Sequence, residues 1–235
     1  METLNNIVLT IQNYMSNYIL VIALLGAGLW FSIRLGFIQV RGFGESMRRT
    51  FGGLFSKKGA AGKDGMSSFQ ALATAIAAQV GTGNIAGAAT ALAIGGAGAI
   101  FWMWIAAFLG MATIYAEAIM AQKYKTVGAD GQVTGGPVYY IRAAFKGTFG
   151  KVLAGIFAVL ITLALGFMGN AVQSNSIAAA FHTAFGIPQW IMGLAVAVIA
   201  LFVFAGGIER IAKVTETVVP FMAALYIVGA LIIII

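Results

Sequence analysis

The sequence predicts an all-α integral membrane protein, and two observations carry that prediction. Hydrophobic residues make up 60% of the chain and charged residues only 9%, whereas soluble domains carry about 25% charged residues. In addition, several long apolar runs reach the roughly 20 residues that a helix needs to cross a bilayer. Residues 1–235 are therefore predicted to form a single transmembrane domain, with spans at about residues 14–33, 66–94, 99–122, 152–185, 189–206 and 214–235.

The basic residues predict the orientation of these spans. All 14 Lys and Arg residues lie in the stretches 34–65, 123–151 and 207–213, which fall on one side of a six-span arrangement. The positive-inside rule places these loops in the cytoplasm and the N-terminus outside. Orientation thus accounts for the net charge of +7, and no nucleic-acid partner is predicted. We expect a multi-pass protein of the plasma (inner) membrane.

The residue types argue against an enzyme. The sequence has no cysteine and one histidine, which excludes thiolate metal sites, disulfides and a cysteine nucleophile. No nucleophile with a neighbouring base is evident. Two acidic residues inside predicted spans, Glu117 and Glu216, lie close in sequence to Lys123 and Lys213. We interpret both as interfacial carboxylates paired locally.

The second span contains a pattern that predicts a broken helix. Gly81 and Gly83 flank Thr82 in the middle of an uncharged run of about 28 residues, beside the amides of Gln79 and Asn84. Glycine lowers helix propensity by about 1 kcal/mol relative to alanine. Backbone groups freed by a break cannot be satisfied by hydrocarbon, so such a break must face protein or a watery cavity. A break of this kind near the midplane can hold a small ion or zwitterion.

The same glycines have a plainer interpretation. Small residues let membrane helices pack closely, and Gly83 and Gly87 form a G-x-x-x-G pattern. Uncharged amides inside a bilayer are costly unless they are paired or hydrated. Gln79 and Asn84 therefore favour a binding site over packing alone.

A second polar cluster lies in the fourth span, whose uncharged run of about 34 residues is too long for an upright helix. Phe167, Asn170 and Gln173 or Ser174 are three or four residues apart and would share one helical face. The cluster is either a hydrated outer mouth or a face directed at the break. In the second case Phe167 would wall a pocket, and Asn170 and Gln173 would donate and accept hydrogen bonds to a polar ligand.

Several motifs together resemble the alanine or glycine:cation symporters, the sodium:alanine symporter family. The resemblance covers essentially the whole chain and matches the N-terminal half of that family. It rests on the runs GTGNIAGAATA (81–91), GGAGAIFWMW (95–104), FLGMAT (108–113), TGGP (134–137) followed by two tyrosines, and GNAVQSNS (169–176).

The resemblance implies a leucine-transporter-type fold, in which two inverted five-helix repeats enclose a midplane site. One outlying span would precede the first repeat, which contains the broken helix. The resemblance further implies a sodium-coupled symporter of alanine or glycine. The substrate would bind at Gly81, Thr82, Gly83, Asn84, Phe167, Asn170 and Gln173, and sodium, as the coupling ion, at the backbone carbonyls of Ala77 and Val80.

Family members are about twice as long as this chain, so the second repeat is not present in it. We expect a truncated chain that carries half a site, with the second repeat available only from another chain. The alternative to a symporter is a non-transporting membrane fragment or assembly subunit, whose glycines serve helix packing.

Overall fold

The structure is a computed structural model that describes residues 2–52, 67–128 and 133–235. The start predicted for the second span, Met66, and the loop residues Lys57, Lys58 and Lys63 lie outside these ranges. The chain divides into two units, which are described separately. The first comprises Met1–Gly44 and Gly95–Ala158, and the second Glu45–Ile94 and Val159–Ile235.

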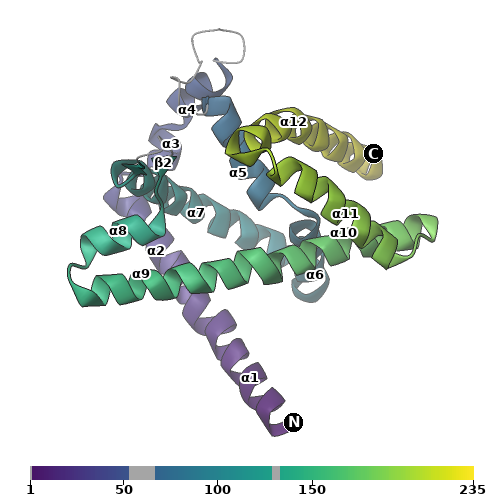
Figure 1. Cartoon of the computed structure of the whole chain (residues 1–235), viewed down its shortest axis with the longest axis horizontal. Coiled ribbons are helices and arrows are strands. Elements are labelled where there is room, and N and C mark those ends of the chain that lie inside the picture. The colour runs from purple at the N-terminus through teal and green to yellow at the C-terminus, as the bar shows by residue number, and fades with distance from the viewer. Residues whose placement is uncertain (1, 53–66, 129–132) are drawn as a thin grey trace. The chain divides into compact units, whose positions relative to one another are not determined.

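The first unit centres on two apolar helices packed along each other, α2 (Val21–Arg34) and α7 (Ala97–Lys123) (Figure 1). The chain turns sharply into α7 at Gly96, whose φ of 62° suits glycine. The remaining elements are α1 (Glu2–Tyr14), the π-helical segment η1 (Met15–Leu20), α3 (Ile38–Arg41), β1 (Thr126–Val127), β2 (Val133–Thr134), α8 (Pro137–Ala144) and the first turns of α9 (Thr148–Ile161). The two strands pair antiparallel, with Thr126 opposite Thr134.

The second unit contains the divided helix, which consists of α5 (Ser68–Gln79) and α6 (Thr82–Gly95). α5 packs against α12 (Gly207–Ile234), and α11 (Gln189–Phe204) packs against both α12 and α10 (Asn170–Phe185). The π-helical segment η3 (Thr162–Gly169) leads directly into α10. The unusually long fourth predicted span is therefore one helical stretch that contains a wider, π-helical segment.

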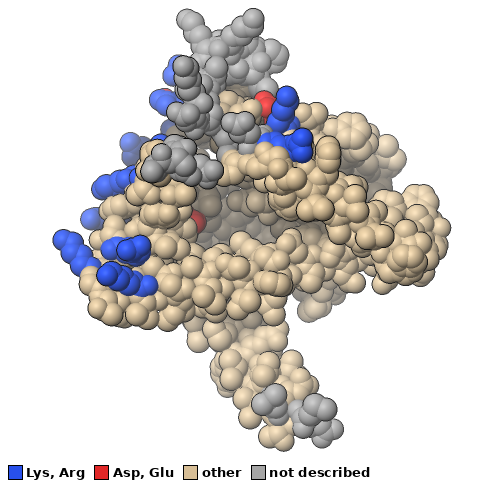
Figure 2. Space-filling model, in the orientation of Figure 1, with Lys and Arg blue, Asp and Glu red and all other residues tan. Residues whose placement is uncertain are grey.

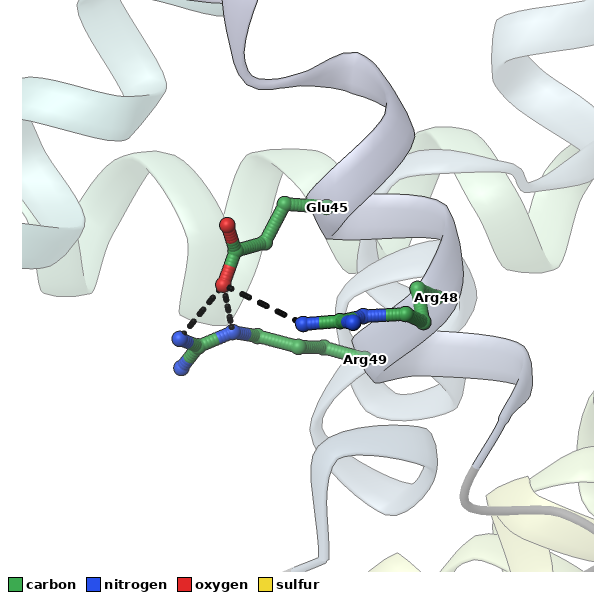
Figure 3. A network of polar contacts seen from close by, with 3 residues as sticks. All are labelled: Glu45, Arg48 and Arg49. Atoms are coloured by element: carbon green, nitrogen blue, oxygen red, sulfur yellow. Dashed lines mark hydrogen bonds and ion pairs between the residues drawn. The ribbon is translucent and has the colours of Figure 1, made fainter.

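A short helix, α4 (Phe43–Phe51), carries a cluster of charges on its exposed surface. Glu45 accepts a hydrogen bond from Arg49 Nη2 at 2.6 Å, and Arg48 Nη2 lies 4.0 Å from the same oxygen (Figure 3). The hydrogen bond from Arg49, aided by the charges of both arginines, holds the pKa of the Glu45 carboxyl below its ordinary value. The opposite charges are thus exposed beside the apolar side chains of the same helix.

Burial in the described chain is the reverse of that in a soluble protein. The buried apolar residues are small, as at Ala73, Ala112, Ala154 and Ala178, whereas large apolar side chains such as Ile94 are exposed. Small residues at the contacts and large apolar residues on the outside are the arrangement of helices packed within lipid. The structure therefore agrees with an all-α membrane protein.

Four described helical stretches are long and apolar enough to cross a membrane: Asn5–Arg34, Ala97–Lys123, Thr148–Phe185 and Arg210–Ile234. They correspond to the first, third, fourth and sixth predicted spans, and most begin several residues earlier than predicted. The prediction followed the apolar run of each span, whereas the helix itself begins earlier, in more polar sequence. The fifth predicted span is a 16-residue apolar helix, and the second is divided between α5 and α6.

Candidate functional site

The interruption of the second span lies at Val80 and Gly81, where the glycine and amide pattern predicts it. α5 ends at Gln79 and α6 begins at Thr82, while Val80 adopts φ −115° and ψ 87°, outside the helical region. The Val80 N–H still donates to the Ile76 carbonyl at 2.8 Å. The last carbonyls of a helix have no partner within it. Within the described ranges no hydrogen bond reaches the carbonyl oxygens of Ala77 or Val80.

Gln173 of α10 places its amide directly into this interruption. Its Oε1 accepts a hydrogen bond of 2.7 Å from the backbone N–H of Gly83 and one of 3.2 Å from Thr82 Oγ1. Its Nε2 donates to Asn84 Oδ1 at 3.0 Å. The first turn of α6 therefore directs a backbone N–H and a hydroxyl at one acceptor oxygen, which is the arrangement of an anion-binding helix N-terminus.

Asn84 connects the two halves of the divided helix. Its Nδ2 donates to the carbonyl of Gln79, the last residue of α5. Its Oδ1 accepts from Gln173, so one side chain contacts the end of α5 and the side chain that occupies the start of α6. These contacts replace backbone hydrogen bonds that the interruption removes, as a break inside a membrane requires.

The two glycines leave the space that Gln173 fills. A Cβ added at Gly81 would lie 2.6 Å from Gln173 Oε1, and one added at Gly83 would lie 3.0 Å from Val172 Cγ1. Any larger residue at either position would compete with the amide. The predicted residues Gly81, Thr82, Gly83, Asn84 and Gln173 thus form one contiguous polar cluster within the second unit.

The other two residues of the predicted pocket are placed differently. Asn170 Nδ2 donates to the Gly166 carbonyl of its own helix at 3.0 Å, and the Phe167 side chain is 66% exposed. Phe167 belongs to η3, where a π-helical turn contains more residues than an α-helical turn. The three-residue spacing from which a shared face was predicted therefore does not hold across the junction at Gly169.

A further polar contact joins the other end of α5 to α12, and the sequence analysis missed it. Gln70 Nε2 donates to Glu216 Oε2 at 2.8 Å, and the hydroxyls of Thr74 and Thr215 lie 3.2 Å apart. The expectation that Glu216 pairs locally is wrong, because its partner lies 146 positions away. The signal was present, since Ser67 and Gln70 have capping-box spacing and a carboxylate inside a span requires a partner.

Comparison with known proteins associates the sequence with one family of transporters. Residues 1–235 match the family described as the sodium:alanine symporter family. The chain is 43% identical over 230 residues to the sodium/alanine symporter AgcS of Methanococcus maripaludis, covering 97% of this chain and 50% of that protein. It is 47% identical over 212 residues to the putative sodium/proton-dependent alanine carrier protein YrbD of Bacillus subtilis, covering 90% and 42%.

A third relative is named for a different amino acid. The probable sodium/glutamine symporter GlnT of Bacillus subtilis is 41% identical over 226 residues, which cover 96% of this chain and 46% of GlnT. The chain thus spans about half the length of the curated relatives it matches. Those relatives carry the matched part and the remainder in a single chain, which gives no support to a second repeat supplied as a separate chain.

Proposed function

Because the chain belongs to the sodium:alanine symporter family, we propose that it acts in sodium-coupled symport of a small neutral amino acid, alanine or glycine. The observation that carries this proposal is the interruption at Val80 and Gly81, where backbone N–H and C=O groups without a partner in their own helix lie in one apolar span. A zwitterion and a cation are the guests that such groups can bind.

The substrate carboxylate is assigned to the start of α6. The Gly83 N–H and the Thr82 hydroxyl both donate to Gln173 Oε1, and the N-terminal end of a helix carries partial positive charge. The amide oxygen of Gln173 accepts from both donors, which supports the assignment of a carboxylate oxygen to the same position. Substrate binding at these donors therefore exchanges one hydrogen-bonded oxygen for another and turns the Gln173 side chain aside.

Sodium, the co-transported ion, is assigned to the end of α5. The carbonyl oxygens of Ala77 and Val80 accept no hydrogen bond within the described chain, and the C-terminal end of a helix favours cations.

Phe167 and Asn170 are assigned to the wall of the proposed substrate pocket, on the side of α10. That assignment requires Phe167 to turn from its exposed position when the pocket is filled.

The proposed fold is of the leucine-transporter type, with one outlying span before a five-helix repeat that contains the divided helix. The proposed location is the plasma (inner) membrane, with the N-terminus outside and the Lys- and Arg-rich loops in the cytoplasm. The carbonyl groups at the end of α5 then belong to the inner half of the span, and the N–H groups at the start of α6 belong to the outer half.

The decisive experiment is an alanine titration with sodium or choline as the cation. It is performed on the chain completed with the part of the Methanococcus maripaludis relative that it does not match, and on the chain alone. We expect the completed protein to bind alanine more tightly in sodium. Alanine should tighten sodium binding by the same factor, because coupling between two sites is reciprocal. Alanine binding of equal affinity in choline would contradict sodium coupling.

A further inference from the structure

A groove of about 350 Å³ lies between α8 and α9 in the first unit, away from the interrupted helix in sequence. Two basic residues from different elements line it, Arg142 of α8 and Lys151 of α9. The rest of its wall is apolar or small, and consists of Val138, Ala154, Gly155 and Ala158. The groove therefore combines a cationic part with a smooth apolar part.

The corner between the two helices gives the groove a fixed shape. Gly147 has a φ of 83°, which permits the tight turn after α8. A Cβ on Gly150 would lie 1.7 Å from the Phe145 carbonyl oxygen, so only glycine allows this approach. The rings of Phe145 and Phe149 meet edge to face, with centroids 5.5 Å apart. These contacts form the groove without a ligand.

Among the described residues, no acidic side chain lines the groove to neutralise its two cations. In the part of the chain that the structure describes, neither Arg142 nor Lys151 forms an ion pair. Partial burial, together with the negative charge of Glu117, raises the pKa of Tyr140, which does not line the groove. Tyr140 is two positions from both Val138 and Arg142, about 200° around the helix. Tyr140 therefore lies on the opposite face of α8 from the groove.

The surface around the groove is basic as well. Figure 2 shows Lys and Arg side chains gathered over α8 and the first turns of α9. Charged side chains that lack protein partners attract counter-charges from their surroundings, and in a membrane protein the nearest surroundings are lipid headgroups. Cytoplasmic leaflets contain anionic lipids, and basic pockets between membrane helices bind such headgroups.

The polarity of the groove also changes with depth. Lys151 is in the first turn of the apolar stretch Thr148–Phe185. Ala158 lies seven positions further along the helix, or about 10 Å at 1.5 Å per residue. Ala154 and Gly155 lie between them and carry no bulk. A ligand that fits must be anionic at one end and apolar about 10 Å away.

We propose that this groove binds one anionic phospholipid. The phosphate contacts Arg142 and Lys151, and the start of an acyl chain lies along Ala154, Gly155 and Ala158. This site shares no residue with the proposed amino-acid site, and its test does not depend on transport. The lipid contacts both α8 and the beginning of a membrane span.

The test is titration of the purified chain of 235 residues in neutral detergent with phosphatidylglycerol or phosphatidylcholine. Bound lipid is counted by native mass spectrometry. We expect one phosphatidylglycerol to bind more tightly than phosphatidylcholine. Arg142→Gln with Lys151→Gln should weaken it about 30-fold, because each basic residue near an anionic lipid contributes about 1 kcal/mol. The matched pair Lys123→Gln with Lys125→Gln should change it less than about twofold.

Two further variants separate charge from shape. Exchange of the two cations, Arg142→Lys with Lys151→Arg, keeps the charge and should retain the lipid. Gly155→Leu keeps both cations but fills the groove, and its Cβ meets no atom within 4 Å. We expect it to weaken phosphatidylglycerol binding about tenfold while circular dichroism shows unchanged helix content.

The proposal would be wrong if the double glutamine variant bound phosphatidylglycerol like the original chain. It would also be wrong if Gly155→Leu bound the lipid normally, or if inorganic phosphate displaced the lipid at equal concentration. Displacement by inorganic phosphate would indicate a simple phosphate site. Should the double glutamine variant lose helix content, Gly155→Leu and the charge exchange decide the question.

Discussion

The glycine at the α2–α7 contact and the glycines at the interruption of the second span differ in what they approach. A Cβ added at Gly28 would lie 2.8 Å from Leu109 Cβ and 3.0 Å from the Leu109 carbonyl oxygen. At Gly81 the atom in the way is the terminal amide oxygen of Gln173, at 2.6 Å. Gly28 therefore admits a neighbouring helix backbone, and Gly81 admits a polar side chain.

This difference separates the two interpretations of glycine in a membrane helix. Gly28 fits close packing, since its neighbour Ser32 is fully buried and donates to the Gly28 carbonyl at 2.7 Å. Gly83 instead has its N–H directed at a side-chain oxygen. Packing explains the first region completely, but it does not explain why hydrogen-bonding groups converge on the second. The alternative of a non-transporting packing element therefore suits α2 better than α6.

The largest expected effect follows from filling the interruption. Gly83→Leu should abolish alanine binding by the completed protein, because its side chain would occupy the space beside Val172 and Gln173 that the substrate carboxylate needs. Gly87→Leu is the matched control in the same helix, since a Cβ there meets nothing within 4 Å. Isothermal titration with alanine in sodium measures both variants. Normal binding by Gly83→Leu would move the substrate away from α6.

The second-largest expected effect follows from placing a negative charge at the interruption. Gln173→Glu keeps an acceptor at the Gly83 N–H but makes it a resident carboxylate, strengthened by the N-terminal end of α6. We expect alanine affinity to fall about 100-fold, or roughly 3 kcal/mol, because two carboxylates would compete for one site. Gln189→Glu, at the exposed start of α11, should leave affinity within about twofold. Unchanged binding by Gln173→Glu would separate Gln173 from the carboxylate site.

The sequence predicted the interruption but not the close helix contact, for a physical reason. Glycine beside membrane amides is an unusual combination, so Gly81, Gly83 and Asn84 identify the break without knowledge of any neighbour. Gly26 and Gly28 look alike in sequence, and only the position of Leu109 on another helix distinguishes them. The sequence signals at Gln70 and at Glu216 did not identify the two residues as partners, because they lie 146 positions apart along the chain.

The π-helical segment η3 shows another limit of sequence analysis. The length of the fourth span indicated an irregular helix, but length alone cannot say whether a helix tilts, bends or widens. The prediction for Phe167 assumed α-helical spacing, which changes within η3. Gln173 lies beyond that segment in α10, and it is the residue of the predicted face that reaches the interruption.

An intermediate effect is expected at the contact between α2 and α7. A substitution there should change the stability of the protein and not its affinity for alanine. Gly28→Ala should lower the free energy of unfolding by about 1–3 kcal/mol, the cost of overpacking a tight contact, because the Leu109 backbone cannot move aside. Gly26→Ala in the same helix meets nothing within 4 Å, and should be neutral or stabilise by up to about 1 kcal/mol. Thermal unfolding followed by circular dichroism measures both. Alanine affinity should stay within about twofold, and a larger change would mean that the two regions are coupled.

The smallest expected effect compares the two regions directly. Gly81→Ala should weaken alanine binding only about fivefold, or roughly 1 kcal/mol, because the obstructing atom is the end of a side chain that can turn. Shortening that side chain in a second variant, Gln173→Asn, removes the obstruction. The double variant should therefore bind alanine better than the sum of the two single effects predicts, and a double-mutant cycle measures this coupling.

No shortening of a side chain could relieve Gly28→Ala in the same way, since the contact there includes the Leu109 backbone. Purely additive effects at Gly81 and Gln173 would mean that the glycine serves backbone geometry alone, and the distinction between the two regions would then be lost.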